Sequence, residues 1–172
     1  NKLNGSIAIL RNPELHALSG LQKISEVGAD ASGTSLNVQS NDVLANLLGF
    51  SGITAVGGAV TVEGNPSLES LDGLQNIQSV AGANTRGNSL EVRMNAALTD
   101  MNALQGLQGH LQGLLVEGNP NVGDVTALEN GITSATDVTI KDVQCLSSAD
   151  AALLDSIAQT TEIETPTGKI GR

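Results

Sequence analysis

A short alternating motif, with two apolar residues flanking one other residue, recurs six times along the chain. The six instances are Ile7/Ile9, Leu36/Val38, Val60/Val62, Leu90/Val92, Leu114/Val116 and Val138/Ile140. In an extended chain, residues two apart lie on the same face, so each pair presents one apolar face. The motif therefore predicts six short β-strands, each packed by one face against a core.

A second motif, with an apolar residue at every third position, fills the chain between these strands. From Asn65 to Val80 it is N-P-S-L-E-S-L-D-G-L-Q-N-I-Q-S-V. Related runs begin 24 to 30 residues apart, at Asn12, Asn41, Asn95 and Asn119. An amphipathic α-helix mixes spacings of three and four, so this strict spacing, with Gly and Pro inside it, predicts short extended pieces or tight turns. One strand in each repeat indicates a parallel β-solenoid, with strands stacked about 4.8 Å apart.

The consensus N-x-x-L-x-x-L-x-G-L-x-x-I-x-x-V, clearest from Asn65 to Val80, resembles the receptor L-domain. That family is the leucine-rich solenoid of growth-factor receptor ectodomains, and related repeats occur in bacterial and protist surface proteins. The resemblance covers roughly Leu3 to Ile140. It implies a mainly β fold, a right-handed parallel β-solenoid of the leucine-rich-repeat kind with about six coils. It also implies a recognition or adhesion module of a secreted or cell-surface protein that binds a protein or glycan partner.

The chain divides into three expected parts: solenoid repeats over residues 1–146, a capping helix over 147–159, and a tail or linker over 160–172. Ser147 is the expected N-cap, with Asp150 at the third helical position. Four apolar residues, Ala149, Leu153, Leu154 and Ile157, are expected to cover the last coil. The first coil shows no such cap. We therefore expect more repeats or a cap upstream of residue 1, or docking of a partner through the uncapped N-terminal edge.

Aligned positions predict inward columns of like residues. One column is Leu15, Leu44, Leu68, Leu98 and Val122, and a second is Leu21, Phe50, Leu74, Leu104 and Leu128. Gly20, Gly49 and Gly73 share a third position, where tight turns are expected. Ala103 and Ala127 replace them in later repeats, so the expected constraint there is a small side chain.

The repeated asparagines Asn12, Asn41, Asn65, Asn95 and Asn119 form a column of their own. We favour a structural role, because a side-chain amide at a solenoid corner can satisfy backbone groups of its own and neighbouring coils. The alternative is a metal or glycan site.

The outward strand positions form two further columns. The first is Ala8, Asn37, Thr61, Glu91, Leu115 and Thr139, and the second is Leu10, Gln39, Glu63, Arg93, Glu117 and Lys141. Charges alternate in sign along the end of the second column, which predicts either a salt-bridge ladder or a polar binding face. Removal of Arg93 separates the two. Loss of stability alone favours the ladder, whereas loss of ligand at unchanged stability favours the binding face.

Extra residues lengthen the turns at Ala29–Ser35 and Ala81–Ser89, in every second repeat. The two turns should therefore lie on the same side of the molecule and form a local ridge. The candidate ligand-binding residues are Asp30, Asn84, Thr85 and Arg86 of this ridge, with Glu91 and Arg93 of the strand columns. Loops carry function more often than cores do. The alternative is that the turns are solvated spacers.

Composition narrows the function classes. The chain has 172 residues, enough for one domain, with a net charge of −10, no Trp or Tyr, and one Phe. Nucleic-acid binding needs a basic footprint and usually stacking aromatics, so this composition excludes it, and the acidity equally disfavours anionic membranes. No apolar run approaches the roughly 20 residues of a membrane span. Cys145 is the only cysteine, so no disulfide can form within the chain.

Catalytic and metal motifs are missing from the sequence. His16 falls in an outward slot and His110 near an inward column, and neither has a partner at metal-ligand spacing. Cys145 is expected to be a small buried residue, and no serine has a base as a partner in the pattern. We therefore expect no enzyme activity, no cofactor and no metal, and an extracellular or cell-surface location. The rival interpretations are a structural solenoid subunit or spacer and, less favoured, a polysaccharide lyase or hydrolase of the β-helix kind.

Overall fold

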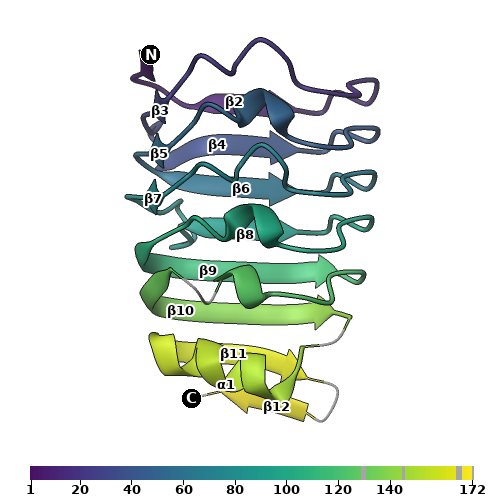
Figure 1. Ribbon diagram of the computed structural model, residues 1–172, viewed down its shortest axis with the longest axis vertical. Helices are drawn as coiled ribbons and strands as arrows, with labels where there is room; N and C mark the ends of the chain where they lie inside the picture. The colour runs from purple at the N-terminus through teal and green to yellow at the C-terminus, as the bar shows by residue number, and fades with distance from the viewer. Residues whose placement is uncertain (129–130, 145, 166–167, 172) are drawn as a thin grey trace.

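The computed structural model describes residues 1–128, 131–144, 146–165 and 168–171. In these ranges the chain is mainly β, with two sheets of parallel strands and one α-helix (Figure 1). The strands of the larger sheet are stacked in chain order from the N-terminal to the C-terminal end of the molecule (Figure 1). This arrangement is compatible with the predicted parallel β-solenoid.

The larger sheet contains all six predicted strands. Its members are β2 (Ile7–Leu10), β4 (Thr34–Gln39), β6 (Ala59–Glu63), β8 (Leu90–Arg93), β9 (Gly109–Asn119), β10 (Ile132–Val143), β11 (Ala158–Thr165) and β12 (Gly168–Gly171). The register pairs aligned positions of successive repeats, as in Leu36 with Val60 and Val60 with Leu90. Every pair from β2 to β11 is parallel, and only β11 with β12 is antiparallel. The alternating motif therefore predicted both the strands and their register.

The runs with three-residue spacing form short pieces, as predicted. Four two-residue strands make the smaller sheet: β1 (Lys2–Leu3), β3 (Glu26–Val27), β5 (Ala55–Val56) and β7 (Ser79–Val80). Three single-turn 3-10 helices lie in the same runs: η1 (Leu48–Phe50), η2 (Asn102–Leu104) and η3 (Thr126–Leu128). Because each piece directs one or two apolar side chains inward, the run packs without an α-helix.

The inward columns form the hydrophobic core. Leu44, Leu68 and Leu98 have no exposed surface, and Phe50 is equally buried in the second column. Leu15 and Leu21, the first members of the two columns, are only partly buried and pack against the core. They lie beside β2, which is the edge strand of the larger sheet among the described residues. The core is thus complete from the second repeat onward and partly open at its first.

The five aligned small residues do not share one conformation, which corrects the expectation of a common tight turn. Gly20 and Gly73 have positive φ angles of 86° and 118°. Gly49, like Ala103 and Ala127, lies in a 3-10 helix. The repeats therefore use two different backbone conformations at this position, and a small side chain is only part of the constraint.

The C-terminal helix begins where the sequence indicates. In α1 (Ser148–Ile157), the Ser147 hydroxyl accepts a hydrogen bond from the Asp150 N–H at 3.1 Å, and the Asp150 carboxylate accepts from the Ser147 N–H at 3.3 Å. The predicted capping box is confirmed.

The buried face of α1 agrees with the expected one at Leu154 and differs elsewhere. Ala151 and Leu154 have no exposed surface, whereas Ala149 and Leu153 are exposed and Ile157 is half-buried. Both sets have helical spacing, so the sequence alone allows either face. The choice follows from how the helix leads into β11 and packs beside β10 and β11.

The segment from Thr160, predicted to be a tail or linker, belongs to the larger sheet. Strand β11 pairs in parallel with β10 and sets Thr161 beside Val138 and Ile163 beside Ile140. Thr161 and Ile163 are both buried, so the strand repeats the inward alternation with Thr in an apolar place. Because a threonine stands where the other strands have an apolar residue, the motif of two apolar residues does not detect this strand.

Candidate functional site

The two long turns share one local structure. In the first turn, the Asp30 N–H donates to the Thr34 carbonyl, and the Asp30 carbonyl accepts from the Gly33 N–H. In the second turn, Asn84 makes the same two hydrogen bonds, with the Asn88 carbonyl and the Gly87 N–H. Gly33 and Gly87 both have positive φ, at 78° and 86°. The shared pattern A-[DN]-x-x-G-x-S-L, present at residues 29–36 and 83–90, encodes this turn twice.

The turns pack side by side, as the predicted ridge requires. A Cβ placed on Gly33 would lie 2.2 Å from the carbonyl oxygen of Ala83, so only glycine allows this approach. The ridge also lies over the strands. Thr61 on β6 and Glu91 on β8, both expected to face outward into solvent, are 2% and 0% exposed. Burial of these two positions corrects the expectation of an open strand face there.

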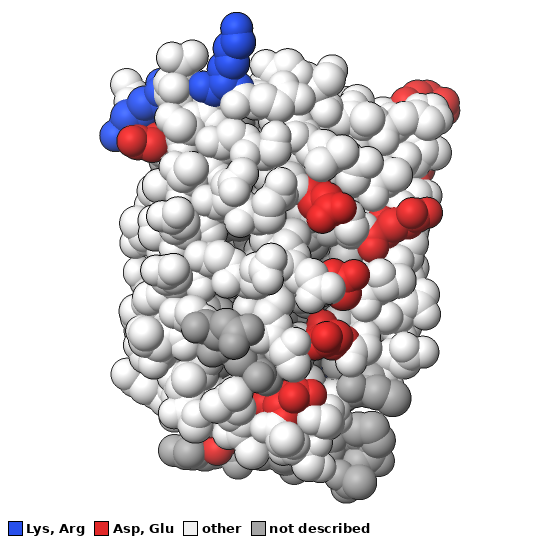
Figure 2. Space-filling view, in the orientation of Figure 1, with Lys and Arg blue, Asp and Glu red and all other residues white. Residues whose placement is uncertain are grey.

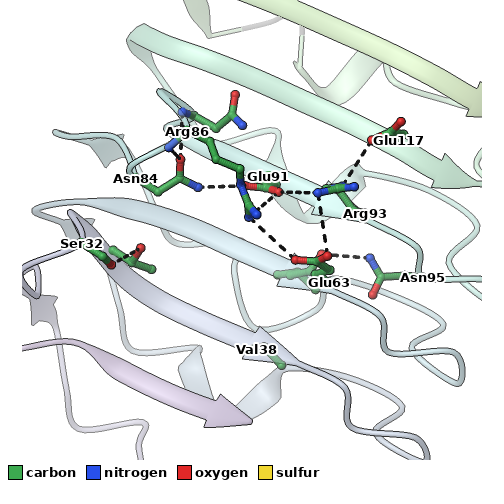
Figure 3. A network of polar contacts seen from close by, with 12 residues as sticks. Ser32, Val38, Glu63, Asn84, Arg86, Glu91, Arg93, Asn95 and Glu117 are labelled. Atoms are coloured by element: carbon green, nitrogen blue, oxygen red, sulfur yellow. Dashed lines mark hydrogen bonds and ion pairs between the residues drawn. The ribbon is translucent and has the colours of Figure 1, made fainter. Parts of the chain in front are cut away.

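Glu91 is the centre of the polar network beneath the ridge (Figure 3). Its carboxylate accepts a hydrogen bond from Asn84 Nδ2 at 2.8 Å and from Arg86 Nε at 3.2 Å, with another Arg86 nitrogen at 2.7 Å. Arg93 Nη1 completes the set at 3.3 Å. A buried carboxylate needs such partners, because an unpaired charge away from water is strongly destabilising. The network therefore ties the turn at residues 81–89 to the sheet.

Arg93 connects Glu91 to both neighbouring strands (Figure 3). It lies 3.8 Å from Glu63 on β6 and 3.3 Å from Glu117 on β9, the latter an ion pair without hydrogen-bond geometry. The alternating charges thus form ion pairs across three strands. Lys141 does not extend this row and instead pairs with Glu162 on β11 at 2.6 Å.

A pocket of about 160 Å³, which we call the ridge pocket, lies between the two turns and the strands beneath. It is lined by Ser32, Thr34, Asn37, Gln39, Thr61, Asn84, Thr85 and Arg86. The structure thus brings together the ridge residues Asn84, Thr85 and Arg86, and the network joins them to Glu91 and Arg93. The strand residues Asn37, Gln39 and Thr61 complete the pocket, and the sequence alone places them only in the outward columns.

Asp30 does not line the pocket, and its side-chain hydrogen bonds are made within its own turn. Its carboxylate accepts hydrogen bonds from the Ser32 hydroxyl at 2.6 Å and from the backbone N–H groups of Ser32 and Thr34. The Ser32 hydroxyl, followed by the Thr34 N–H, lowers the pKa of Asp30 below its usual 3.8. The carboxylate is therefore charged at neutral pH and acts as the fixed acceptor of the turn.

The asparagine column is structural. Each amide from Asn41 to Asn119 donates to a carbonyl of the preceding repeat, and each carbonyl oxygen accepts from the asparagine before it, as Asn65 Oδ1 does from Asn41. The residue before each corner has a left-handed backbone conformation. Positive φ angles are found at Arg11, Ser40, Gly64, Met94, Gly118 and Asp142. In the described ranges, no three His, Cys, Asp or Glu residues are grouped to hold a metal ion.

The histidines differ from expectation in one case. His16 is exposed, as expected, but His110 is exposed too rather than near the inward column. The reason is that β9 begins at Gly109, with φ of 90°, which turns Leu111 inward instead. His110 Nδ1 lies 2.8 Å from the Ser134 hydroxyl, so one serine does have a base as a partner. The other ring nitrogen faces Thr136, at 3.5 Å, and not a carboxylate.

The face seen in Figure 2 has a row of acidic side chains. Acidic side chains follow one another down the stacked repeats on the face seen in Figure 2, with the basic ones in view at the N-terminal end. Among the described residues, no helix has the length and apolar character needed to cross a bilayer. Cys145 lies outside the described residues.

Comparison with protein-family models, curated proteins and solved structures finds no match. The resemblance to receptor L-domains therefore stays a prediction, and the geometry above is the basis for a functional proposal.

Replacement of Arg93 tests the network. We expect Arg93→Ala to lower the free energy of unfolding by about 1.5–3 kcal/mol, the usual range for a hydrogen bond to a charged group. The reason is that buried Glu91 loses a partner and faces Glu63 and Glu117 without the intervening guanidinium. Urea unfolding followed by circular dichroism measures the loss.

Lys23→Ala is the matched control, because it removes one positive charge from an exposed side chain. Its effect should stay within about 0.5 kcal/mol. Equal effects of the two variants would show that the network contributes no more than surface charge does.

Proposed function

We propose that this protein is a non-catalytic recognition or adhesion module, built as a right-handed parallel β-solenoid of about six coils. The proposed location is secreted or at the cell surface, and the proposed binding surface is the ridge with its pocket. The single observation that carries this proposal is the buried network around Glu91, which holds Asn84 and Arg86 in place at the rim of a polar pocket.

The network supports a binding role because it fixes the polar side chains of a long turn against the sheet. Asn84 is held from both sides: its Nδ2 donates to Glu91, while its Oδ1 accepts from the Arg86 N–H at 3.0 Å and the Asn88 N–H at 3.1 Å. Preorganised polar groups lose less entropy when a ligand binds, so less of the contact energy is offset. A passive spacer needs the stability that the network gives the fold, but it does not need polar groups held at the rim of a pocket.

Binding screens with two defined probe sets test the proposal. The immobilised 172-residue chain is exposed to a printed glycan array and to an array of purified extracellular protein domains. Thr85→Trp adds bulk to an exposed side chain at the pocket rim and leaves the Glu91 contacts intact. Gln105→Trp adds the same bulk to an exposed residue beside η2, in the run between β8 and β9.

We expect binding to at least one array that Thr85→Trp abolishes and Gln105→Trp retains. Binding that survives both substitutions would place the surface elsewhere, and the absence of specific binding on both arrays would overturn the recognition role. The melting temperatures of both variants should match that of the parent chain, because both positions are exposed.

A further inference from the structure

The ridge pocket has the lining of a site for a small and uniformly polar ligand. Its walls are hydroxyl groups of Ser32, Thr34, Thr61 and Thr85, amides of three residues and one guanidinium group. An aliphatic or aromatic ligand would displace water from these polar groups and would offer no partner to Asn37 Oδ1, which has none in the described part of the chain. The only aromatic residue of the chain, Phe50, is buried in the core, so a ligand here must be held by hydrogen bonds and not by stacking.

The volume limits the ligand to a single ring or its equivalent. The pocket has about 160 Å³, whereas sites that bury drug-sized ligands have roughly 300–1,000 Å³. It holds the equivalent of about five water molecules at their share of liquid volume, about 30 Å³ each. An open pocket of this size can hold most of one monosaccharide unit at the end of a chain, but not an extended oligosaccharide.

An unsatisfied group in the lining indicates what the ligand must offer. Asn37 Oδ1 is buried and has no hydrogen-bond partner among the described residues. Asn37 on β4 lies directly beside Thr61 on β6, so the amide and the threonine hydroxyl belong to the same part of the lining. Buried polar atoms in native proteins are nearly always satisfied by protein, water or ligand. A hydroxyl group suits this place because it donates to the amide oxygen and accepts from a neighbouring hydroxyl.

Charge argues against an anionic ligand. Arg86 is the one cation in the lining, and it is already paired with buried Glu91 at 2.7 Å, with Glu63 at 3.8 Å. The network as a whole joins the carboxylates of Glu63, Glu91 and Glu117 to only two guanidinium groups. A carboxylate or phosphate ligand would add negative charge to this surplus, whereas a neutral hydroxylated ring would not.

We propose that the ridge pocket binds a neutral polyhydroxylated ligand, one terminal sugar ring of a glycan, through Asn37, Thr61 and Thr85. This inference rests on the proposed function and specifies the partner of the same surface. Because no stacking face is present, the affinity for a free monosaccharide should be in the millimolar range, with avidity arising from repeated display.

A titration by nuclear magnetic resonance tests the proposal. The isotope-labelled chain is titrated with glucose, galactose, mannose and N-acetylglucosamine, and glycerol serves as a hydroxylated additive without a ring. We expect at least one sugar to shift the backbone amides of β4, β6 and residues 84–86 in a saturable way. Glycerol should give no saturable shift.

Two variants remove single hydroxyls from the lining, and one matched variant does not. Thr61→Val keeps the shape of a buried side chain, and Thr85→Val changes an exposed turn residue whose substitution does not threaten folding. Each should weaken sugar binding about five- to tenfold, the effect of one lost hydrogen bond. Thr139→Val, at the equivalent strand position on β10 and outside the pocket lining, should leave the affinity unchanged.

Saturable shifts that respond equally to all three variants, or no saturable shift with any sugar, would overturn the sugar assignment. That failure differs from failure of the recognition role. If Thr85→Trp abolishes binding of an extracellular protein domain while no sugar binds, the ridge is a recognition surface for protein and the pocket contains water only.

Discussion

Asn65→Ala is expected to lower the free energy of unfolding by about 4 kcal/mol or more, although it removes only a side-chain amide. Asn65 Oδ1 accepts from the backbone N–H of Asn41 at 3.1 Å and from its Nδ2 at 3.0 Å. Asn65 Nδ2 donates to the Val38 carbonyl at 3.1 Å. These atoms lie away from water, so alanine leaves several of them unpaired at once, at about 1–3 kcal/mol each.

Asn12→Ala is the matched control, because Asn12 occupies the same corner of the first repeat but is exposed. Water replaces the amide there, so its loss should cost less than about 1.5 kcal/mol. The chain has no Trp or Tyr, and circular dichroism during urea unfolding is therefore the suitable signal. Similar losses of unfolding free energy from Asn65→Ala and Asn12→Ala would contradict the stabilising role of the buried hydrogen bonds, because burial is what distinguishes the two sites.

The register of the larger sheet could be predicted because its information is local. Each strand has two apolar residues two apart, and a shift by one residue would expose both. The same reasoning located Asn41, Asn65, Asn95 and Asn119, because a residue repeated at each corner stacks on itself. Strand β11 shows the limit: Thr161 occupies an apolar position, where its β-branched shape suits a strand and its hydroxyl donates to Asp155.

The candidate site could be predicted only in part, because its geometry depends on where a turn docks. The lengths of the two turns indicated a ridge, and the charges at Glu63, Arg93 and Glu117 indicated ion pairs. Neither pattern shows that the turn at residues 81–89 covers Glu91. One signal was present: the column of Glu91 also contains Ala8, Thr61 and Leu115, a composition more apolar than a solvated face requires.

Glycines explain why the turns are side by side, and the sequence alone cannot show which of them are essential. Gly33 is essential to the contact because the Ala83 carbonyl occupies the place of its side chain. Gly87, at the equivalent position of the other turn, has open space there. The two residues look identical in the repeated pattern, and only the neighbour across the ridge distinguishes them.

Gly73→Ala is the second substitution with a large expected effect, and we expect it to lower the free energy of unfolding by about 2–6 kcal/mol. Two penalties combine: a φ of 118° that a side chain rarely adopts, at about 1–3 kcal/mol, and overpacking, at about 1–3 kcal/mol. The added Cβ would lie 1.8 Å from the carbonyl oxygen of Leu47. The chain cannot move away freely there, because the Leu47 N–H donates to the Asp72 carbonyl at 2.8 Å.

Gly20→Ala separates the two penalties. Gly20 has a φ of 86°, but nothing lies within 4 Å of an added Cβ. Only the backbone penalty remains, about 1–2 kcal/mol, less a few tenths gained because alanine restricts the unfolded chain. Urea unfolding should therefore show a loss for Gly73→Ala at least twice that for Gly20→Ala. Equal losses would mean that φ alone sets the requirement. In that case Ala103 and Ala127 are tolerated because their 3-10 helices avoid positive φ, and the space between repeats has no part in it.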